Sequence, residues 1–207
     1  MPDKRTLKAP PPVSLVSGLP AEQRRAALDL FWSAFSRKLR FSLGPEERAL
    51  RILARGIDPE STLCAIDAAG KLVGFAAIKS AARGFLNLTL THFYQEYGIA
   101  SGLLRALIMK QLDYKPADHE LMIESLCVNE TARGRGIGQM LLSHMQHAAS
   151  QQNKQLILDV IADNSGARRL YAHRGFYETG RKNIGFLAPL FGFREVIRMQ
   201  FTPHTPD

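Results

Sequence analysis

Apolar positions along the chain recur with two different spacings, and these spacings predict helices and strands. Residues 21–39 repeat apolar side chains at helical spacing. The Gly-Pro-Glu-Glu segment at residues 44–47 predicts the start of a second helix, which ends at Gly56. Residues 62–66 and 72–78 are apolar runs separated by Asp-Ala-Ala-Gly, which is typical of a β-hairpin.

The pattern is sharpest from residue 120 onwards. Asp163, Asn164 and Ser165 are typical of a helix N-terminus, and the helix that they open is expected to end near residue 174. Residues 85–112, rich in Leu, Phe and Tyr, predict one broken helix or two short ones. Residues 138–151 predict a helix with one apolar face, made by Ile137, Met140, Leu141, Met145 and Ala148. The other apolar runs predict strands at residues 13–16, 121–128, 155–161, 176–179 and 195–201.

This order of elements predicts the fold class. Helices and strands alternate along 207 residues, which fits a single α/β domain with a mixed central β-sheet flanked by helices. A helical insertion precedes the strand at residues 121–128. We assign residues 13–202 to this domain, residues 1–12, which contain three consecutive prolines, to a flexible N-terminal tail, and residues 203–207 to a C-terminal tail.

The cysteines and the apolar segments bear on the location of the protein. Cys64 and Cys127 both lie within apolar runs, which is typical of buried reduced thiols and not of a disulfide framework or a zinc site. The N-terminus has no apolar segment typical of a secretory signal, and polar residues interrupt the longest apolar region. We therefore expect a cytoplasmic protein without a membrane span.

The formal net charge of +8 and the pI of about 9.8 favour an anionic partner. Nucleic acid, an acidic membrane surface and a phosphorylated cofactor all fit that charge. A nucleic-acid or ribosome-binding module would need an RNP motif, a helix-turn-helix or base-stacking aromatics on a basic sheet, and none is visible. We expect no nucleic acid partner and keep this module as a weaker alternative.

A glycine-rich turn, Arg133-Gly134-Arg135-Gly136-Ile137-Gly138, follows one predicted strand and opens a helix. Glycines let a pyrophosphate approach the main chain, and the helix N-terminus adds about half a positive charge. The turn lacks the Gly-Lys-Ser/Thr of a Walker A loop and the third glycine of a Rossmann loop, although Asp159 lies at a suitable distance for a ribose-binding acid. Arg133, Gly136 and Gly138 match the acetyl-CoA loop, R/Q-x-x-G-x-G/A. A turn that binds no ligand is the remaining alternative.

Residues 120–180 resemble the GNAT superfamily, the Gcn5-related N-acetyltransferases. The strand Ile-Glu-Ser-Leu-Cys-Val at 123–128, the glycine-rich turn with its helix, and the pattern Asn164-x-x-Ala167-x-x-x-Tyr171-x-x-x-Gly175-Phe176 occur in the family order. The resemblance implies acetyl-CoA as acyl donor and an acceptor that carries an amine. It implies a sheet that opens beside residues 126–128, so that Leu126, Cys127 and Val128 contact pantetheine and the acetyl carbonyl. It further implies that the backbone of residues 133–138 holds the pyrophosphate and that Asn164 helps to hold the cofactor arm.

The reaction needs a base because an amine with a pKa of about 10.4 is protonated at neutral pH. Glu124 is the candidate, with Glu120 in reserve, and a solvated carboxylate on an edge strand is the alternative. The resemblance implies that Tyr171 is the acid that protonates the leaving thiolate, and a tyrosine that only packs the core is the alternative. The main-chain N–H of Val128 is a candidate donor to the thioester carbonyl.

Two further side-chain groups suggest chemistry that we do not expect. An acyl-cysteine at Cys127 would need a thiolate, and no cationic residue is adjacent to stabilise one. His144 and His147 share a helix face but have no third ligand, so we expect no metal.

Two questions about function stay open in the sequence. A GNAT-fold protein that binds CoA without catalysis is the main alternative to an active enzyme. The acceptor is expected to be selected by residues 31–55, 85–115 and 182–193. Residues 85–115 are expected to cover the acceptor cleft or to form a homodimer contact, because they are long, apolar and inserted before the cofactor strand.

Overall fold

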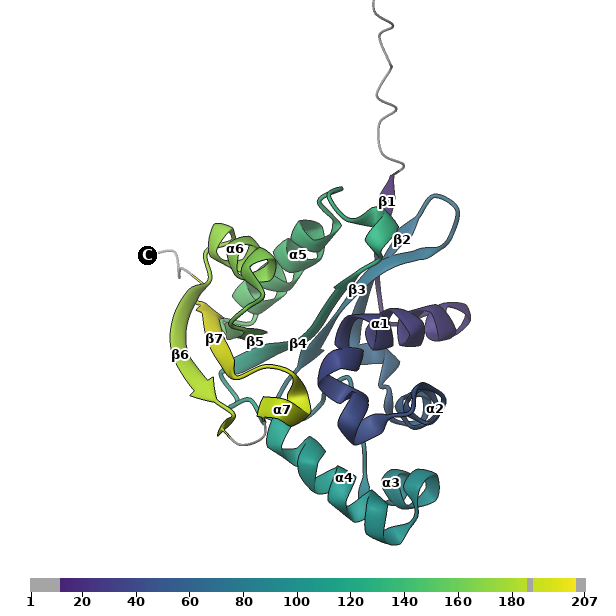
Figure 1. The fold of residues 1–207 in the computed structure, drawn as a ribbon. Coiled ribbons are helices and arrows are strands. Elements are labelled where there is room, and N and C mark those ends of the chain that lie inside the picture. The colour runs from purple at the N-terminus through teal and green to yellow at the C-terminus, as the bar shows by residue number, and fades with distance from the viewer. Residues whose placement is uncertain (1–11, 186–187, 204–207) are drawn as a thin grey trace, which may run out of the picture.

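The computed structural model describes residues 12–185 and 188–203, and its centre is a seven-stranded sheet (Figure 1). The strand order is β1-β2-β3-β4-β5-β7-β6. Only the β4–β5 pair is parallel, and all other neighbours are antiparallel, so the sheet is mixed as predicted. The strands are β1 (Val13–Ser17), β2 (Thr62–Asp67), β3 (Leu72–Lys79), β4 (Glu120–Val128), β5 (Gln155–Ile161), β6 (Tyr177–Asn183) and β7 (Glu195–Phe201).

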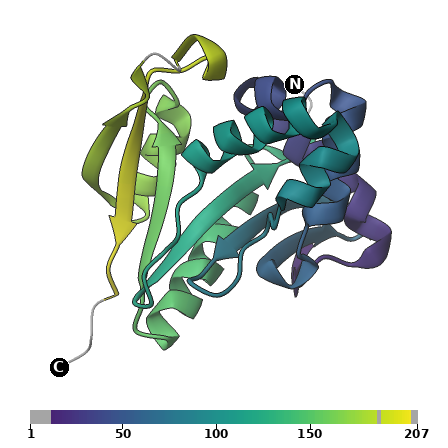
Figure 2. The same ribbon diagram turned by 90° about the horizontal axis from the view of Figure 1, so that it is seen from below.

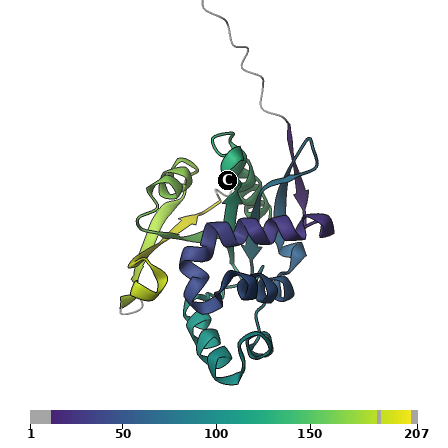
Figure 3. The same ribbon diagram turned by 45° about the vertical axis from the view of Figure 1, so that its right-hand side comes forward.

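Helices cover both faces of the sheet. One face carries α1 (Arg24–Leu43) and α2 (Glu46–Gly56), with α3 (Leu90–Tyr97) and α4 (Ile99–Leu112) beside them. The opposite face carries α5 (Ile137–Gln151) and α6 (Ser165–His173). Figures 2 and 3 show this arrangement, with α1 crossing the sheet on one side and α5 on the other. The α/β fold with helices on both faces is therefore confirmed.

Each face of the sheet has its own apolar core. On the α1 side, the rings of Phe31 and Phe75 each lie 5.6 Å from the ring of Phe85. On the α5 side, Leu141 and Met145 pack on Leu156 and neighbouring strand residues. The alternation of side chains along each strand sends successive residues to opposite cores, which is why the apolar runs of this sheet are nearly continuous.

Most predicted elements are present, and their differences have local causes. Residues 21–23 form a short 3-10 turn before α1, and α1 continues to Leu43 because Leu39, Ser42 and Leu43 extend its buried face. Residues 85–112 contain two helices, separated at Gly98, whose φ of 76° ends α3. In α5 the buried face includes Leu142 and Ala149, whereas Met140 and Ala148, which we predicted to be on it, are half-buried.

The C-terminal part departs further from the prediction. β6 begins one residue later and extends to Asn183, and all seven of its residues are exposed. It is an edge strand that pairs with β7 alone, so it carries no apolar alternation that could reveal its length. The four-residue helix α7 (Ala188–Phe191) was not predicted. Most of the two predicted tails, residues 1–11 and 204–207, lies outside the described residues, and no helix within the described part is long and apolar enough to cross a membrane.

Candidate active site

The middle of β4 contains a β-bulge at Glu124. Ala77 of β3 lies opposite Ser125, whereas the next β3 residue, Ile78, lies opposite Ile123, so Glu124 is an extra residue in β4. A bulge re-aims side chains locally and is frequent beside active sites. Here Glu124 and Ser125, although adjacent, both line a cavity on the α1 side of the sheet.

The bulge coincides with the place where β4 and β5 separate. The parallel ladder ends at the pair Ile123 and Leu158. Beyond it, β4 pairs only with β3 and β5 pairs only with β7, and the two strands diverge toward their carboxyl ends (Figure 2). The sheet therefore opens beside residues 126–128, as the family resemblance implied.

The register of β3 and β4 determines which backbone groups face this opening. Asn129 donates its N–H to the carbonyl of Val73 at 2.9 Å, so residues 73 and 129 form a hydrogen-bonded pair. Pairs alternate along an antiparallel ladder, so Val128, opposite Gly74, directs its N–H and C=O away from β3. Leu126, opposite Ala76, does the same. The N–H and C=O of these two residues thus point toward the opening between β4 and β5.

Glu124 is held inside the protein. Its Oε2 accepts a 2.8 Å hydrogen bond from the main-chain N–H of Phe85. Burial raises the pKa of the Glu124 carboxyl above its usual value, while the positive charge of Lys79 and the N–H groups of Phe85 and Leu86 oppose that rise. The alternative of a solvated carboxylate on an edge strand is wrong, because β4 is the fourth of seven strands in the sheet.

Glu120 occupies a different environment at the start of β4. Its Oε2 accepts hydrogen bonds of 2.9 Å from the Tyr114 hydroxyl and from the main-chain N–H of Ala117. It does not line the cavity that contains Glu124. Its position therefore indicates a role in holding the segment before β4.

Tyr171 lies on α6 and is 9% exposed. Its ring centroid is 5.9 Å from that of Phe176. Burial, with a smaller effect from the nearby Cys127 thiol, raises the pKa of Tyr171 to about 12. Within the described residues its hydroxyl makes no hydrogen bond. The residue thus packs in the core and keeps a protonated, unengaged hydroxyl near the carboxyl-terminal part of β4.

The two thiols are poorly suited to nucleophilic attack. Cys127 is 2% exposed, and burial raises the pKa of its thiol. Cys64 is fully buried, and burial raises the pKa of its thiol to about 11. A thiolate is the reactive form of cysteine, so both environments disfavour an acyl-cysteine.

The glycine-rich turn leads directly into α5. Gly134 and Gly136 have φ values of 74° and 77°, and Gly136 is the N-cap of the helix. No atom lies within 4 Å of the Cβ position of either glycine, so both face open space. The first turn of α5 presents main-chain N–H groups without helical partners beside these glycines. Arg133 forms an exposed ion pair of 3.2 Å with Glu130.

Gly138 connects this turn to β4. A Cβ atom at this position would lie 3.7 Å from both Val128 and Leu170. The N-terminus of α5 therefore lies next to the end of β4 and to α6. The structure thus brings together three predicted parts of the site: Val128 at the end of β4, the glycine-rich turn, and helix α6.

Asn164 and Asp159 both have structural partners. The Asn164 Oδ1 caps α6 by accepting the N–H of Ala167 at 3.1 Å. Asp159 binds the guanidinium of Arg198 through both oxygens, at 2.8 and 2.9 Å. An acid engaged in this way does not match the ribose-binding acid of the Rossmann alternative.

The cavity beside Glu124 has a volume of about 680 Å³. Helix α1, the segment after β3, and helices α3 and α4 form its walls together with β4. The helical insertion therefore lines the same cavity as Glu124. Lys38 of α1 also lines the cavity, although the sequence patterns did not single it out. The available signal was a lysine seven residues after Phe31 and three after Phe35, on the apolar face of the helix.

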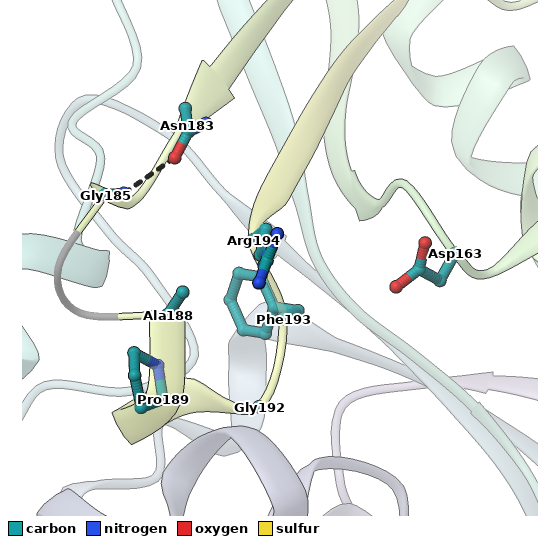
Figure 4. Close-up of a pocket in the computed structure, with 8 residues that line it drawn as sticks. All are labelled: Asp163, Asn183, Gly185, Ala188, Pro189, Gly192, Phe193 and Arg194. Atoms are coloured by element: carbon teal, nitrogen blue, oxygen red, sulfur yellow. Dashed lines mark hydrogen bonds between the residues drawn. The ribbon is translucent and has the colours of Figure 1, made fainter.

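A second cavity of about 670 Å³ lies between β6, β7 and α7. Figure 4 shows Asp163 on one side of it and Arg194 and Phe193 on the other, with Asn183 accepting a 2.7 Å hydrogen bond from the N–H of Gly185. None of the predicted catalytic or cofactor-binding residues lines this cavity. His144 and His147 are exposed on α5, and the described residues contain no group of three or more side chains that could hold a metal.

The sequence of this chain is similar to that of a known protein family. The model of the acetyltransferase (GNAT) family matches residues 25–176. The chain belongs to the GNAT acetyltransferase family. Its expected activity class, acyl transfer, follows from that membership, and acetyl-CoA is the acyl donor typical of the family. A comparison with curated proteins finds no match.

Solved structures share the fold at low sequence identity. An N-acetyltransferase from Staphylococcus aureus Mu50 is 17% identical, with a TM-score of 0.63 over 91% of this chain and 100% of its own. The ribosomal-protein-S18-alanine N-acetyltransferase from Escherichia coli is 16% identical, with a TM-score of 0.57 over 94% and 96%. A GCN5-related N-acetyltransferase from Kribbella flavida is 19% identical, with a TM-score of 0.56 over 92% and 97%. These similarities establish the GNAT fold.

Proposed function

We propose that this GNAT protein transfers the acetyl group of acetyl-CoA to a primary amine by direct attack in a ternary complex. The observation that carries the proposal is the opening of the sheet at Ile123 and Leu158, next to a bulge that directs Glu124 into a cavity. The opening offers a place for the acyl donor and the cavity a place for the acceptor. Glu124 lies where the two meet.

The residues around the opening fit acetyl-CoA. The outward backbone groups of Leu126 and Val128 can pair with the amides of the pantetheine arm, much as an added strand would. Residues 133–138 present open glycines and the N-terminus of a 15-residue helix to the pyrophosphate. The side-chain amide of Asn164 keeps its N–H groups available, because only its oxygen is used to cap α6.

The mechanism assigns the proton transfers to two residues. Glu124, directly or through one water, accepts the proton that the attacking amine loses. Its raised pKa brings its basicity closer to that of the amine than an exposed glutamate would allow. Tyr171 donates its hydroxyl proton to the sulfur as the carbon–sulfur bond breaks, which leaves the free thiol of CoA. The N–H of Val128 stabilises the negative charge on the carbonyl oxygen.

The cellular setting is part of the same proposal. Two unpaired, buried cysteines suit a reducing cytoplasm. Helix α4 exposes Leu104 and Leu107, and a homodimer formed through the helical insertion stays a prediction.

Thermal unfolding with acetyl-CoA, NAD and ATP in parallel tests the choice of donor. A ligand at ~100 times its dissociation constant adds about 2.7 kcal/mol to the stability of the folded state. We expect stabilisation by acetyl-CoA and not by NAD. Thiol release with a panel of amines then distinguishes an active enzyme from a GNAT-fold protein that only binds CoA; binding without release for any amine would contradict the proposed activity.

A further inference from the structure

Lys38 projects from α1 into the cavity that contains Glu124. It lies between Phe35 and Leu39 on a helix whose neighbouring residues form the α1-side core. Burial lowers the pKa of its ammonium group, and the negative charges of Asp159 and Glu124 oppose that effect. Among the described residues, no hydrogen bond or ion pair engages Lys38.

The other cations around this cavity differ from Lys38. Lys79 forms an ion pair with Asp113, and Arg83 binds both Asp58 and Glu60. Arg198, next to Asp159, is engaged by both oxygens of that carboxylate. The two remaining lysines of the lining, Lys110 and Lys115, are exposed to solvent, which stabilises their charge. Lys38 is thus the cation that faces the interior of the cavity without a close counterion within the described chain.

The rest of the cavity wall is mostly apolar. Helix α1 contributes Phe31 and Phe35, and the helical insertion contributes Phe93, Ala106 and Met109. A ligand that fills about 680 Å³ against these side chains must therefore carry an apolar body. A charged amine removed from water beside them is costly unless an opposite charge meets it.

We propose that Lys38 binds a carboxylate of the acceptor, and that the acceptor joins this carboxylate and the reacting amine to an apolar body. The amine then faces Glu124 while the carboxylate faces Lys38. This inference rests on the proposed function, because it concerns the acceptor of that reaction. A monoanion fits better than a phosphate, since a single lysine holds it and the carboxylate of Glu124 in the same cavity repels additional negative charge.

Three related probes test the recognition on the full-length protein. L-phenylalanine has both charged groups, 3-phenylpropanoate has only the carboxylate, and phenethylamine has only the amine. Calorimetry measures the binding of 3-phenylpropanoate, which involves no catalysis. Lys38→Met removes the charge and keeps an unbranched apolar side chain, Lys38→Arg keeps the charge, and Lys71→Met is the matched control because Lys71 is exposed in the turn between β2 and β3.

The expected result is a loss of affinity for 3-phenylpropanoate of roughly tenfold or more in Lys38→Met, the size typical of a lost charge-assisted contact. Lys38→Arg retains part of the affinity, and Lys71→Met binds as the wild type does. Thiol release should show kcat/KM for L-phenylalanine falling in Lys38→Met by a factor at least roughly tenfold larger than any change in kcat/KM for phenethylamine. Thermal stability of Lys38→Met that is no lower than that of the wild type shows that the fold is intact, because burial disfavours the charge that this variant removes.

Three outcomes would overturn the inference: no binding of 3-phenylpropanoate to the wild type, equal binding to Lys38→Met, or acetylation of Lys38 itself, seen by mass spectrometry after incubation with acetyl-CoA. A failure of the proposed acetyltransferase activity can be distinguished from a failure of this inference about Lys38. It would appear as no thiol release with any amine, while the binding of 3-phenylpropanoate still depended on Lys38.

Discussion

The main-chain N–H of Phe85 donates a 2.8 Å hydrogen bond to Oε2 of Glu124, across 39 positions of sequence. Phe85 is fully buried between the rings of Phe31 and Phe75. The donor is therefore anchored by the core, and it holds the carboxylate at the bulge of β4. The same segment begins the helical insertion, so one contact connects the proposed base to the wall of the cavity in which we place the acceptor.

Replacing Glu124 by Gln should remove the base and keep the shape of the site. We expect kcat/KM at neutral pH to fall by about 10²–10⁴, the usual contribution of general-base catalysis. Burial raises the pKa of Glu124, so the wild type should lose activity on acidification at a pH above the value of about 4.3 for an exposed glutamate. The ionisation of the acceptor is common to both enzymes and cancels in the ratio of their pH profiles.

The same variant should not lose stability at neutral pH. The raised pKa of Glu124 means that the folded protein binds this proton more tightly than the unfolded chain does, so the wild type loses stability as pH rises through the folded-state pKa. Glu124→Gln lacks that loss of stability, so its melting temperature at pH 7 should be no lower than that of the wild type. Glu120→Gln is the control on the same strand. If Glu120→Gln lost as much activity as Glu124→Gln, the assignment of Glu124 as the base would be wrong.

Tyr171→Phe can be compared with Tyr97→Phe, because both tyrosines are 9% exposed and burial raises both pKa values to about 12. The Tyr97 hydroxyl donates to the carbonyl of Leu43, whereas the Tyr171 hydroxyl makes no hydrogen bond within the described residues. Tyr97→Phe should therefore cost about 1 kcal/mol of unfolding free energy and leave turnover unchanged.

Tyr171→Phe should behave in the opposite way. Its thermal stability should stay close to that of the wild type, while kcat falls by about 10² because the leaving thiolate loses its proton donor. The difference in kcat between Tyr171→Phe and the wild type should be smaller with an acetyl thioester whose leaving thiol is more acidic. The thiolate of a more acidic thiol can leave with less help from a proton donor. A deficit that did not depend on the leaving group would point to packing as the only role of Tyr171.

Local patterns predicted most of the elements in which we place the cofactor. The apolar run of β4, the glycine turn and the N-cap at Asn164 are each short, contiguous signals that the fold retains. They also place Tyr171 on the helix that faces β4. These local patterns determine the order of the helices and strands and the residues that form each of them.

Other features depend on contacts between distant segments and were not predictable in this way. The bulge at Glu124 exists only in the register of β4 against β3. The hydrogen bond from Phe85 depends on how the insertion leaves β3. Lys38 interrupts the apolar face of α1 in the sequence, but this interruption alone does not reveal a cavity. The cavity that Lys38 lines is formed by segments that are distant in the sequence.

Cys127 should take no covalent part in the reaction. The sulfur lies within the core, and burial disfavours its thiolate. We expect Cys127→Ala to retain turnover within a factor of a few and to lose about 1 kcal/mol of unfolding free energy, as removal of one buried group does. Cys64→Ala, at a fully buried position, is the control for the loss of stability. Intact-mass analysis after incubation with acetyl-CoA should show no acetyl adduct on Cys127, and finding one would refute direct attack.

Alanine variants at Gly136 and Gly70 distinguish an effect on cofactor binding from an effect of backbone strain. Their φ values are 77° and 74°, and no atom lies within 4 Å of the Cβ position in either case. An alanine at either site is therefore strained by its backbone conformation and not by a clash, which costs roughly 1–2 kcal/mol of unfolding free energy. Urea unfolding should show similar losses for Gly136→Ala and Gly70→Ala.

Only Gly136→Ala should impair binding of acetyl-CoA. Its new methyl group enters the open space at the N-terminus of α5, where we place the pyrophosphate, whereas Gly70 lies in the turn between β2 and β3. A strained residue also displaces the N–H groups that the helix presents to an anion. Calorimetry should show the dissociation constant of acetyl-CoA rising roughly tenfold or more for Gly136→Ala, the equivalent of about 1.4 kcal/mol, and unchanged for Gly70→Ala. Equal affinity in the two variants would mean that the turn at residues 133–138 does not hold the pyrophosphate.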